Sequence, residues 1–167
     1  AFVDAADVEP LTAAVRRSNP EATAAEVLFT VATARGYWRD SVLQTEHKAT
    51  QAPAGGAPVW SYRILWRTPV EAGRRISPHN LDLPFVFDNV DRAVFFDGPP
   101  TTETDAMARS MSRAWLAFAR SGDPNHDAIP SWRPYDMTTR TVLHLDVPPT
   151  AIDDDHRAPA RRDHGLA

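Results

Sequence analysis

Residues 58–66 read PVWSYRILW, and this stretch is the clearest strand in the sequence. It is rich in aromatic and β-branched residues, which favour strands, and turn residues bound it on both sides. Side chains alternate between the two faces of a strand, and here both faces carry apolar residues. The pattern is typical of a central strand that is covered on both sides.

The chain before this strand has the apolar spacing of helices. Pro10 is expected to open a short first helix, and Asn19-Pro20-Glu21 is expected to start a second that Gly36 ends. A third helix is predicted over residues 38–48.

The chain after the strand contains the most regular helical pattern, over residues 103–120. Thr102 and Asp105 have capping-box spacing at its start, and Gly122 is placed to end it in a left-handed conformation. Residues 141–147, TVLHLDV, alternate as a final strand.

The composition excludes several classes of protein. The chain has 167 residues, 43% hydrophobic and 24% charged, which suits one globular domain with a sizeable core. A formal net charge of −4 argues against a nucleic-acid binder, which needs a basic face. The absence of cysteine excludes disulfides and thiolate zinc sites, and no apolar run is long enough to span a membrane.

Residues 77–87 read SPHNLDLPFVF and contain the principal candidate for chemistry, His79. Pro78 precedes it and an apolar run follows Asn80, so His79 is expected on a turn at the edge of a buried segment. A histidine there can act as a general base, although a single histidine beside an apolar run is more often structural. No G-x-S-x-G occurs in the chain, so the base has no recognisable nucleophile.

Two neighbours of His79 are weaker candidates. Asp82, three residues on, is expected to point away from it and to fix the loop, through a hydrogen bond or an ion pair with Arg74 or Arg75. Ser77 has no strand-turn-helix context and is interpreted as part of the loop.

Metal sites are not expected. Asp123, Asn125 and Asp127 have the spacing of a calcium loop, but Ala128 and Pro134 replace its glycine and its bidentate glutamate. The segment is interpreted as a turn that ends the preceding helix, and no His-Glu-x-x-His pair exists.

Three stretches in a fixed order resemble the C-terminal third of a type B carboxylesterase, the family of para-nitrobenzyl esterases and cholinesterases. PVWSYRILW resembles the strand before the family's histidine, and SPHNLDLPFVFDN resembles its His-x-x-Asp/Glu-Leu-Pro-Phe-Val-Phe element. AWLAFARSGDPN (114–125), SWRPYD (131–136) and TVLHLDV resemble its Trp-x-x-Phe-Ala-x-x-Gly-x-Pro-Asn, its Trp-Pro-x-Tyr and its closing strand. The resemblance covers about residues 37–147, and it departs where Pro78 replaces a small residue.

The resemblance implies an α/β fold: a C-terminal fragment of an α/β-hydrolase, with the last central strands and their covering helices. Residues 1–147 would belong to the catalytic domain and residues 148–167 would form a flexible tail. His79 would be the triad histidine, and the serine and the acid would precede Ala1, because the triad follows the order Ser, Asp or Glu, His.

The intact parent would hydrolyse small-molecule carboxylic esters through an acyl-serine intermediate, with no metal or organic cofactor. The isolated chain would be inactive. Trp60, Tyr62 and Phe85 would either line an acyl pocket near His79 or pack under the helices. An unpaired strand edge predicts a homo-oligomer or association with the N-terminal part of the enzyme. The alternative function is a non-catalytic, cholinesterase-like interaction module.

Overall fold

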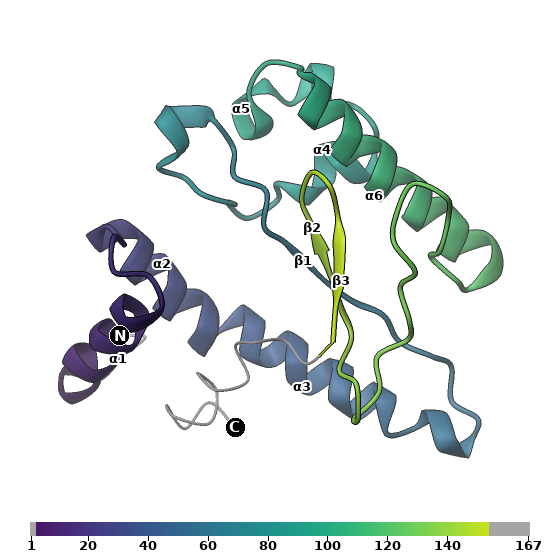
Figure 1. Ribbon diagram of the computed structural model, residues 1–167, viewed down its shortest axis with the longest axis horizontal. Coiled ribbons are helices and arrows are strands. Elements are labelled where there is room, and N and C mark those ends of the chain that lie inside the picture. The colour runs from purple at the N-terminus through teal and green to yellow at the C-terminus, as the bar shows by residue number, and fades with distance from the viewer. Residues whose placement is uncertain (1–2, 154–167) are drawn as a thin grey trace. The chain divides into compact units, whose positions relative to one another are not determined.

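The computed structural model describes residues 3–153, which form two compact units. One unit contains the chain up to Pro58, and the other contains Val59–Asp153 (Figure 1). None of the helices in residues 3–153 has the length and hydropathy that crossing a bilayer requires.

The first unit is helical. Its elements are α1 (Ala5–Ser18), α2 (Ala24–Arg35), α3 (Tyr37–Ala49) and the short 3₁₀ turn η1 (Ala52–Ala54). The third helix and the end of the second at Gly36 confirm the expectation from the sequence.

The starts of the first two helices differ from the expectation. Pro10 lies inside α1 rather than at its beginning, so residue 10 cannot donate a helical hydrogen bond. The second helix begins after Thr23, because Thr23 and Glu26 form a complete capping box. The Thr23 N–H donates to Glu26 Oε2 over 2.9 Å, and the Glu26 N–H donates to Thr23 Oγ1 over 3.2 Å.

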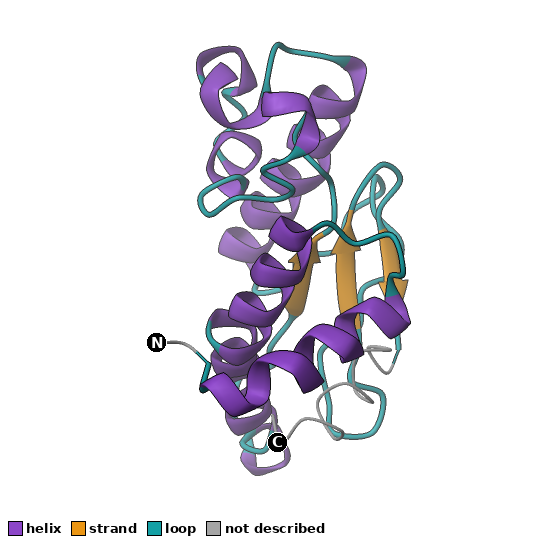
Figure 2. Cartoon of the chain, turned by 90° about the vertical axis from the view of Figure 1, so that its left-hand side faces the viewer, coloured by secondary structure: helices purple, strands orange, loops and turns teal. Residues whose placement is uncertain are grey.

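The second unit is built on a three-stranded sheet in the order β1-β2-β3 (Figure 2). The strands are β1 (Ser61–Ile64), β2 (Val142–Leu145) and β3 (Thr150–Ile152). β1 and β2 are parallel, with Tyr62 opposite Leu143, and β2 and β3 are antiparallel. The helical elements are η2 (Val70–Gly73), α4 (Asp82–Val86), η3 (Val90–Arg92), α5 (Val94–Asp97) and α6 (Thr102–Ser121).

The core of this unit lies between the sheet and the helices α4 and α6. Met107 and Met111 of α6 are fully buried in one cluster with Leu143 and Leu145 of β2. Because side chains alternate along a strand, Leu143 and Leu145 lie on the same face of β2. The apolar stripe of the long helix, Met107, Met111, Ala114, Trp115 and Phe118, is core only in part. Met107, Met111 and Ala114 are fully buried, whereas Trp115 is partly buried and Phe118 is 50% exposed.

Two aromatic pairs join β1 to α6 in edge-to-face geometry. The ring centroids of Trp60 and Phe118 are 5.8 Å apart, and those of Tyr62 and Trp115 are 4.9 Å apart. Helix α6 therefore covers the face of residues 58–66 that carries Trp60 and Tyr62.

The C-terminal end of α6 confirms the prediction, and its N-terminal cap differs from it by one residue. Gly122 adopts φ 77° and ends the helix, as expected. The cap is formed by Thr101 and Thr104 rather than by Thr102 and Asp105, so the predicted capping box is one residue out of place. The Thr101 N–H donates to Thr104 Oγ1 over 2.8 Å, so a threonine performs the role usual for glutamate.

The expected flexible tail, 148–167, is wrong at its start, because Thr150–Ile152 form β3. The rest of that tail, 154–167, lies outside the described residues. All four residues of β2 are buried, so the backbone groups on the side of β2 away from β1 would lack partners without β3.

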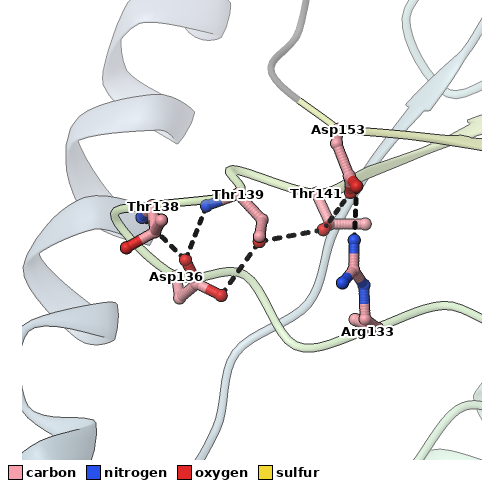
Figure 3. Close-up of polar contacts among 6 residues, drawn as sticks. All are labelled: Arg133, Asp136, Thr138, Thr139, Thr141 and Asp153. Atoms are coloured by element: carbon pink, nitrogen blue, oxygen red, sulfur yellow. Dashed lines mark hydrogen bonds and ion pairs between the residues drawn. The ribbon is translucent and has the colours of Figure 1, made fainter.

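A polar network holds the end of β3 (Figure 3). Thr141 Oγ1 donates to Asp153 over 2.7 Å, and Arg133 forms an ion pair with the same carboxylate. Asp136 accepts from the backbone N–H groups of Thr138 and Thr139, both over 2.7 Å. Hydrogen bonds from Thr139 lower the pKa of Asp136, and those from Thr141 and Arg133 lower the pKa of Asp153.

One carboxyl group is buried in the second unit without compensation. Asp97, the last residue of α5, is fully buried, and neither of its carboxylate oxygens has a hydrogen-bond partner among the described residues. Burial raises the pKa of Asp97 to about 6, against a smaller lowering by its own backbone N–H.

Asp97→Asn is predicted to change how stability depends on pH. Because the folded-state pKa is raised, ionised Asp97 opposes folding; the cost is absent below about pH 4, grows up to about pH 6 and is constant above it. The free energy of unfolding of the variant should exceed that of the unmodified protein by about 2–3 kcal/mol at pH 7.5 and should equal it at pH 4. Urea unfolding at both pH values measures this, with the exposed Asp91→Asn as the control; equal gains at both pH values would contradict it.

Thr141→Val is predicted to release Asp153 and loosen β3. The largest cause of the lowered Asp153 pKa is the Thr141 hydroxyl, so its removal should bring that pKa back toward the usual value. Carboxyl NMR titration and amide exchange of β3 check both effects. Thr138→Val is the matched control, because Thr138 joins the network through its backbone N–H. An unchanged titration of Asp153 would refute the assignment.

Candidate functional site

His79 lies on a turn that follows the carboxyl end of β1. The Leu81 N–H donates to the Pro78 carbonyl over 3.1 Å, and Asn80 adopts a left-handed φ of 70°, which asparagine tolerates. His79 is exposed, whereas Leu81 is 1% exposed and belongs to the core. The turn therefore exposes the imidazole of His79 to solvent, while Leu81, two residues on, is packed in the core.

The segment after the turn is a short helix, α4, with only one buried side. Phe85 is fully buried, and its ring meets Trp66 edge-on with centroids 5.4 Å apart. Leu83 and Phe87 are 44% and 70% exposed. The expected buried segment next to His79 is thus buried on one side and presents apolar side chains on the other.

The segment before the turn is fixed to the chain that leaves β1. The Ser77 hydroxyl donates to the Trp66 carbonyl, and the Thr68 N–H donates to the Ile76 carbonyl over 2.9 Å. The Trp66 N–H in turn donates to Leu145 of β2 over 3.3 Å. The path from the sheet to His79 is therefore a short series of hydrogen bonds.

The loop enclosed by these contacts has an unusual backbone. Glu71, Ala72 and Ile76 have φ of 55°, 57° and 57°, which side chains with a Cβ rarely adopt. Arg75 holds this loop against α5, because its guanidinium donates to the Phe95 carbonyl over 3.2 Å and lies 4.6 Å from the Phe95 ring centroid.

The ion pair suggested for Asp82 with Arg74 or Arg75 is wrong for the described residues. Arg74 donates to the Glu71 carbonyl over 3.2 Å, and Arg75 has the Phe95 contacts given above. Asp82 instead lies in the first turn of α4, where the helix dipole favours an acid. Its charge is the second cause, after burial, of the raised pKa of Tyr62.

The three aromatic residues considered for an acyl pocket pack against other rings. Phe85 faces Trp66 in the core, and Trp60 and Tyr62 face α6. Of the two interpretations left open by the sequence, packing under the helices accounts for these contacts.

A hollow of about 320 Å³ lies in the first unit between α1 and α2. Its lining is apolar, with Leu11, Val27 and Leu28 among its residues, and Arg16 is its one charged member. It contains no group suited to acid-base or nucleophilic chemistry.

The suspected calcium loop is a turn, as predicted. Asp123 accepts from the N–H and the side-chain amide of Asn125, which lower its pKa, and Asp127 pairs with Arg113. In residues 3–153 no group of three or more His, Cys, Asp or Glu side chains is arranged to hold a metal ion.

Two residues of the second unit have roles that no sequence pattern indicates. The Ser77 hydroxyl is not ordinary loop, because it donates to the Trp66 carbonyl. Asp97 is buried by contacts far along the chain, and its only local signal is the following glycine, at which a Cβ would lie 3.0 Å from Pro69 Cγ.

Comparison with known proteins shows the family to which this chain is similar. A profile of the carboxylesterase family matches residues 21–162. The chain is 33% identical over 111 residues to the para-nitrobenzyl esterase of Bacillus subtilis (strain 168), which covers 66% of this chain and 21% of that protein. It is 33% identical over 89 residues to the phenmedipham hydrolase of Pseudarthrobacter oxydans, which covers 52% of this chain and 18% of that protein.

Solved structures share the fold over nearly the whole chain. A thermophilic para-nitrobenzyl esterase superposes with a TM-score of 0.70 at 26% identity, covering 97% of this chain and 32% of that one. A carboxylesterase of Geobacillus stearothermophilus superposes with a TM-score of 0.73 at 26% identity. The match covers 93% of this chain and 31% of that one. The chain thus spans about a fifth of the curated relatives and about a third of these structures. Since the profile matches most of its residues, the chain belongs to the carboxylesterase family and carries part of the α/β-hydrolase fold.

Proposed function

We propose that this chain supplies His79 as the general acid-base of a serine carboxylesterase whose nucleophile and acid lie in another part of the protein. The observation that supports it is the exposed imidazole on a turn fixed at both ends, by Ser77 and by Leu81. In open α/β sheets, ligands bind outside the carboxyl ends of the strands, and this turn follows the carboxyl end of β1.

The proposed chemistry is acyl transfer in two steps. The serine oxygen attacks the ester carbonyl while His79 accepts the hydroxyl proton; the tetrahedral intermediate then expels the alcohol, which takes that proton from His79. In the second step His79 accepts a proton from water, the resulting oxygen nucleophile attacks the acyl-serine, and the proton returns to the serine as the acid leaves. Imidazole suits both directions because its ordinary pKa is close to neutral pH.

The class of substrate follows from the family and from the surroundings of His79. The relatives include a para-nitrobenzyl esterase and a phenmedipham hydrolase. Leu83 and Phe87, four and eight residues after His79, are exposed apolar side chains on the same segment. Together they support a small ester with an apolar group rather than a charged polymer.

His79→Ala in the full-length protein is predicted to lower kcat for para-nitrophenyl acetate by about 10³-fold to 10⁶-fold, since the triad acts as a unit. His47→Ala is the matched control, because His47 is an exposed histidine in the first unit. The purified 167-residue chain should not exceed the buffer rate. A full-length His79→Ala protein that retained its rate, or turnover by the chain alone, would contradict the proposal.

The isolated chain is also expected to associate. Within residues 3–153, β1 pairs with a strand on one side only, β2, so its other edge can accept a further strand. A homo-oligomer or a complex with the N-terminal part of the enzyme would cover this edge. Light scattering across a dilution series tests it, and a strictly monomeric chain at high concentration that also failed to bind the N-terminal part would refute it.

A further inference from the structure

We propose that Ser77 is a positioning residue for His79, a role that rests on the proposed function. Its half-buried hydroxyl donates to the Trp66 carbonyl, and that contact joins the histidine turn to the end of β1. A serine at this place could instead be solvated loop; the hydrogen bond to the main chain of a buried residue distinguishes it.

Little freedom remains between this hydroxyl and the imidazole. Pro78 is the one residue between Ser77 and His79, and its ring fixes φ near −65°. The bond from the Leu81 N–H to the Pro78 carbonyl closes the turn on the other side. A displacement of Ser77 would therefore be transmitted to the His79 backbone rather than absorbed by intervening residues.

The acceptor of the hydroxyl is itself immobile. Trp66 is 5% exposed, its N–H donates to Leu145, and its indole N–H donates to Glu103 over 3.3 Å. Its ring also contacts Phe85 of α4. Ser77 thus connects the turn to a residue that is held from β2, α4 and α6.

The neighbouring loop makes this connection necessary. Ile76, directly before Ser77, has a left-handed φ of 57°, which is costly for a β-branched residue. Without the Ser77 hydroxyl, relaxation of Ile76 would displace the segment that leads to His79. A shift of about 1 Å in a general base can cost about a hundredfold in rate.

The test compares Ser77→Val with Ser77→Thr in the full-length protein, because the two side chains have nearly the same shape and differ by the hydroxyl. Hydrolysis of para-nitrophenyl acetate is measured as kcat per titrated active site, which corrects for misfolded protein. Ser77→Val should lower kcat by about tenfold to a hundredfold with KM within about twofold, and Ser77→Thr should remain within about threefold of the unmodified protein.

Ser121→Ala is the matched control, since Ser121 also donates to a backbone carbonyl, that of Ala117 over 2.9 Å, but at the end of α6. Its kcat should not change. Equal kcat for Ser77→Val and Ser77→Thr would overturn the positioning role, as would a rise in KM with unchanged kcat. If His79→Ala loses activity while Ser77→Val keeps it, only the role of Ser77 fails; if His79→Ala stays active, the proposed function fails with it.

Discussion

The structure of the second unit depends on the contacts of Trp66. Its main chain bonds to β2 through the N–H and to the histidine turn through the carbonyl, while its ring packs on α4 and its indole N–H bonds to α6. One residue, two positions beyond β1, thereby contacts the sheet, the two covering helices and the turn with His79. The bond to Leu145 and the ring contact with Phe85 join buried residues, and an unmade hydrogen bond costs more in a buried place than in water.

This arrangement fixes the backbone on both sides of an exposed side chain. His79 itself is exposed, but the residues on both sides of it are fixed, by Ser77 to Trp66 and by Leu81 in the core. General base catalysis needs both exposure and a fixed position, because the ring must reach the substrate and must stay within hydrogen-bonding distance of it. The strained loop before the turn and the buried Asp97 are unfavourable features that the same packed unit tolerates.

Parts of this fold could be predicted from the sequence because their signals are local. Two strands, predicted at 58–66 and 141–147 and observed as the shorter Ser61–Ile64 and Val142–Leu145, depend on alternation. The long helix that ends at Gly122 depends on periodicity and a left-handed glycine. Where local signals competed, the prediction was wrong: Asn19-Pro20 suggested a helix start, but the capping box at Thr23 decided it.

Other features are set by tertiary contacts and have no pattern of their own. β3 is three residues long and lies between prolines and aspartates, and it is a strand only because β2 is buried beside it. The role of Ser77 depends on the carbonyl of a residue eleven positions earlier, and Gly98, directly after the buried Asp97, lies against Pro69. The family motif in the sequence indicates His79, whereas the contacts that fix its neighbours are visible only in the structure.

The most direct test of this account is a crystal structure of the full-length protein with its nucleophile labelled by a fluorophosphonate. The account predicts that the labelled residue is a serine outside residues 1–167 and that an imidazole nitrogen of His79 lies about 2.6–3.2 Å from its oxygen. The turn should keep the Ser77–Trp66 bond in that structure. A labelled serine with His79 beyond hydrogen-bonding reach, and another histidine in its place, would contradict it.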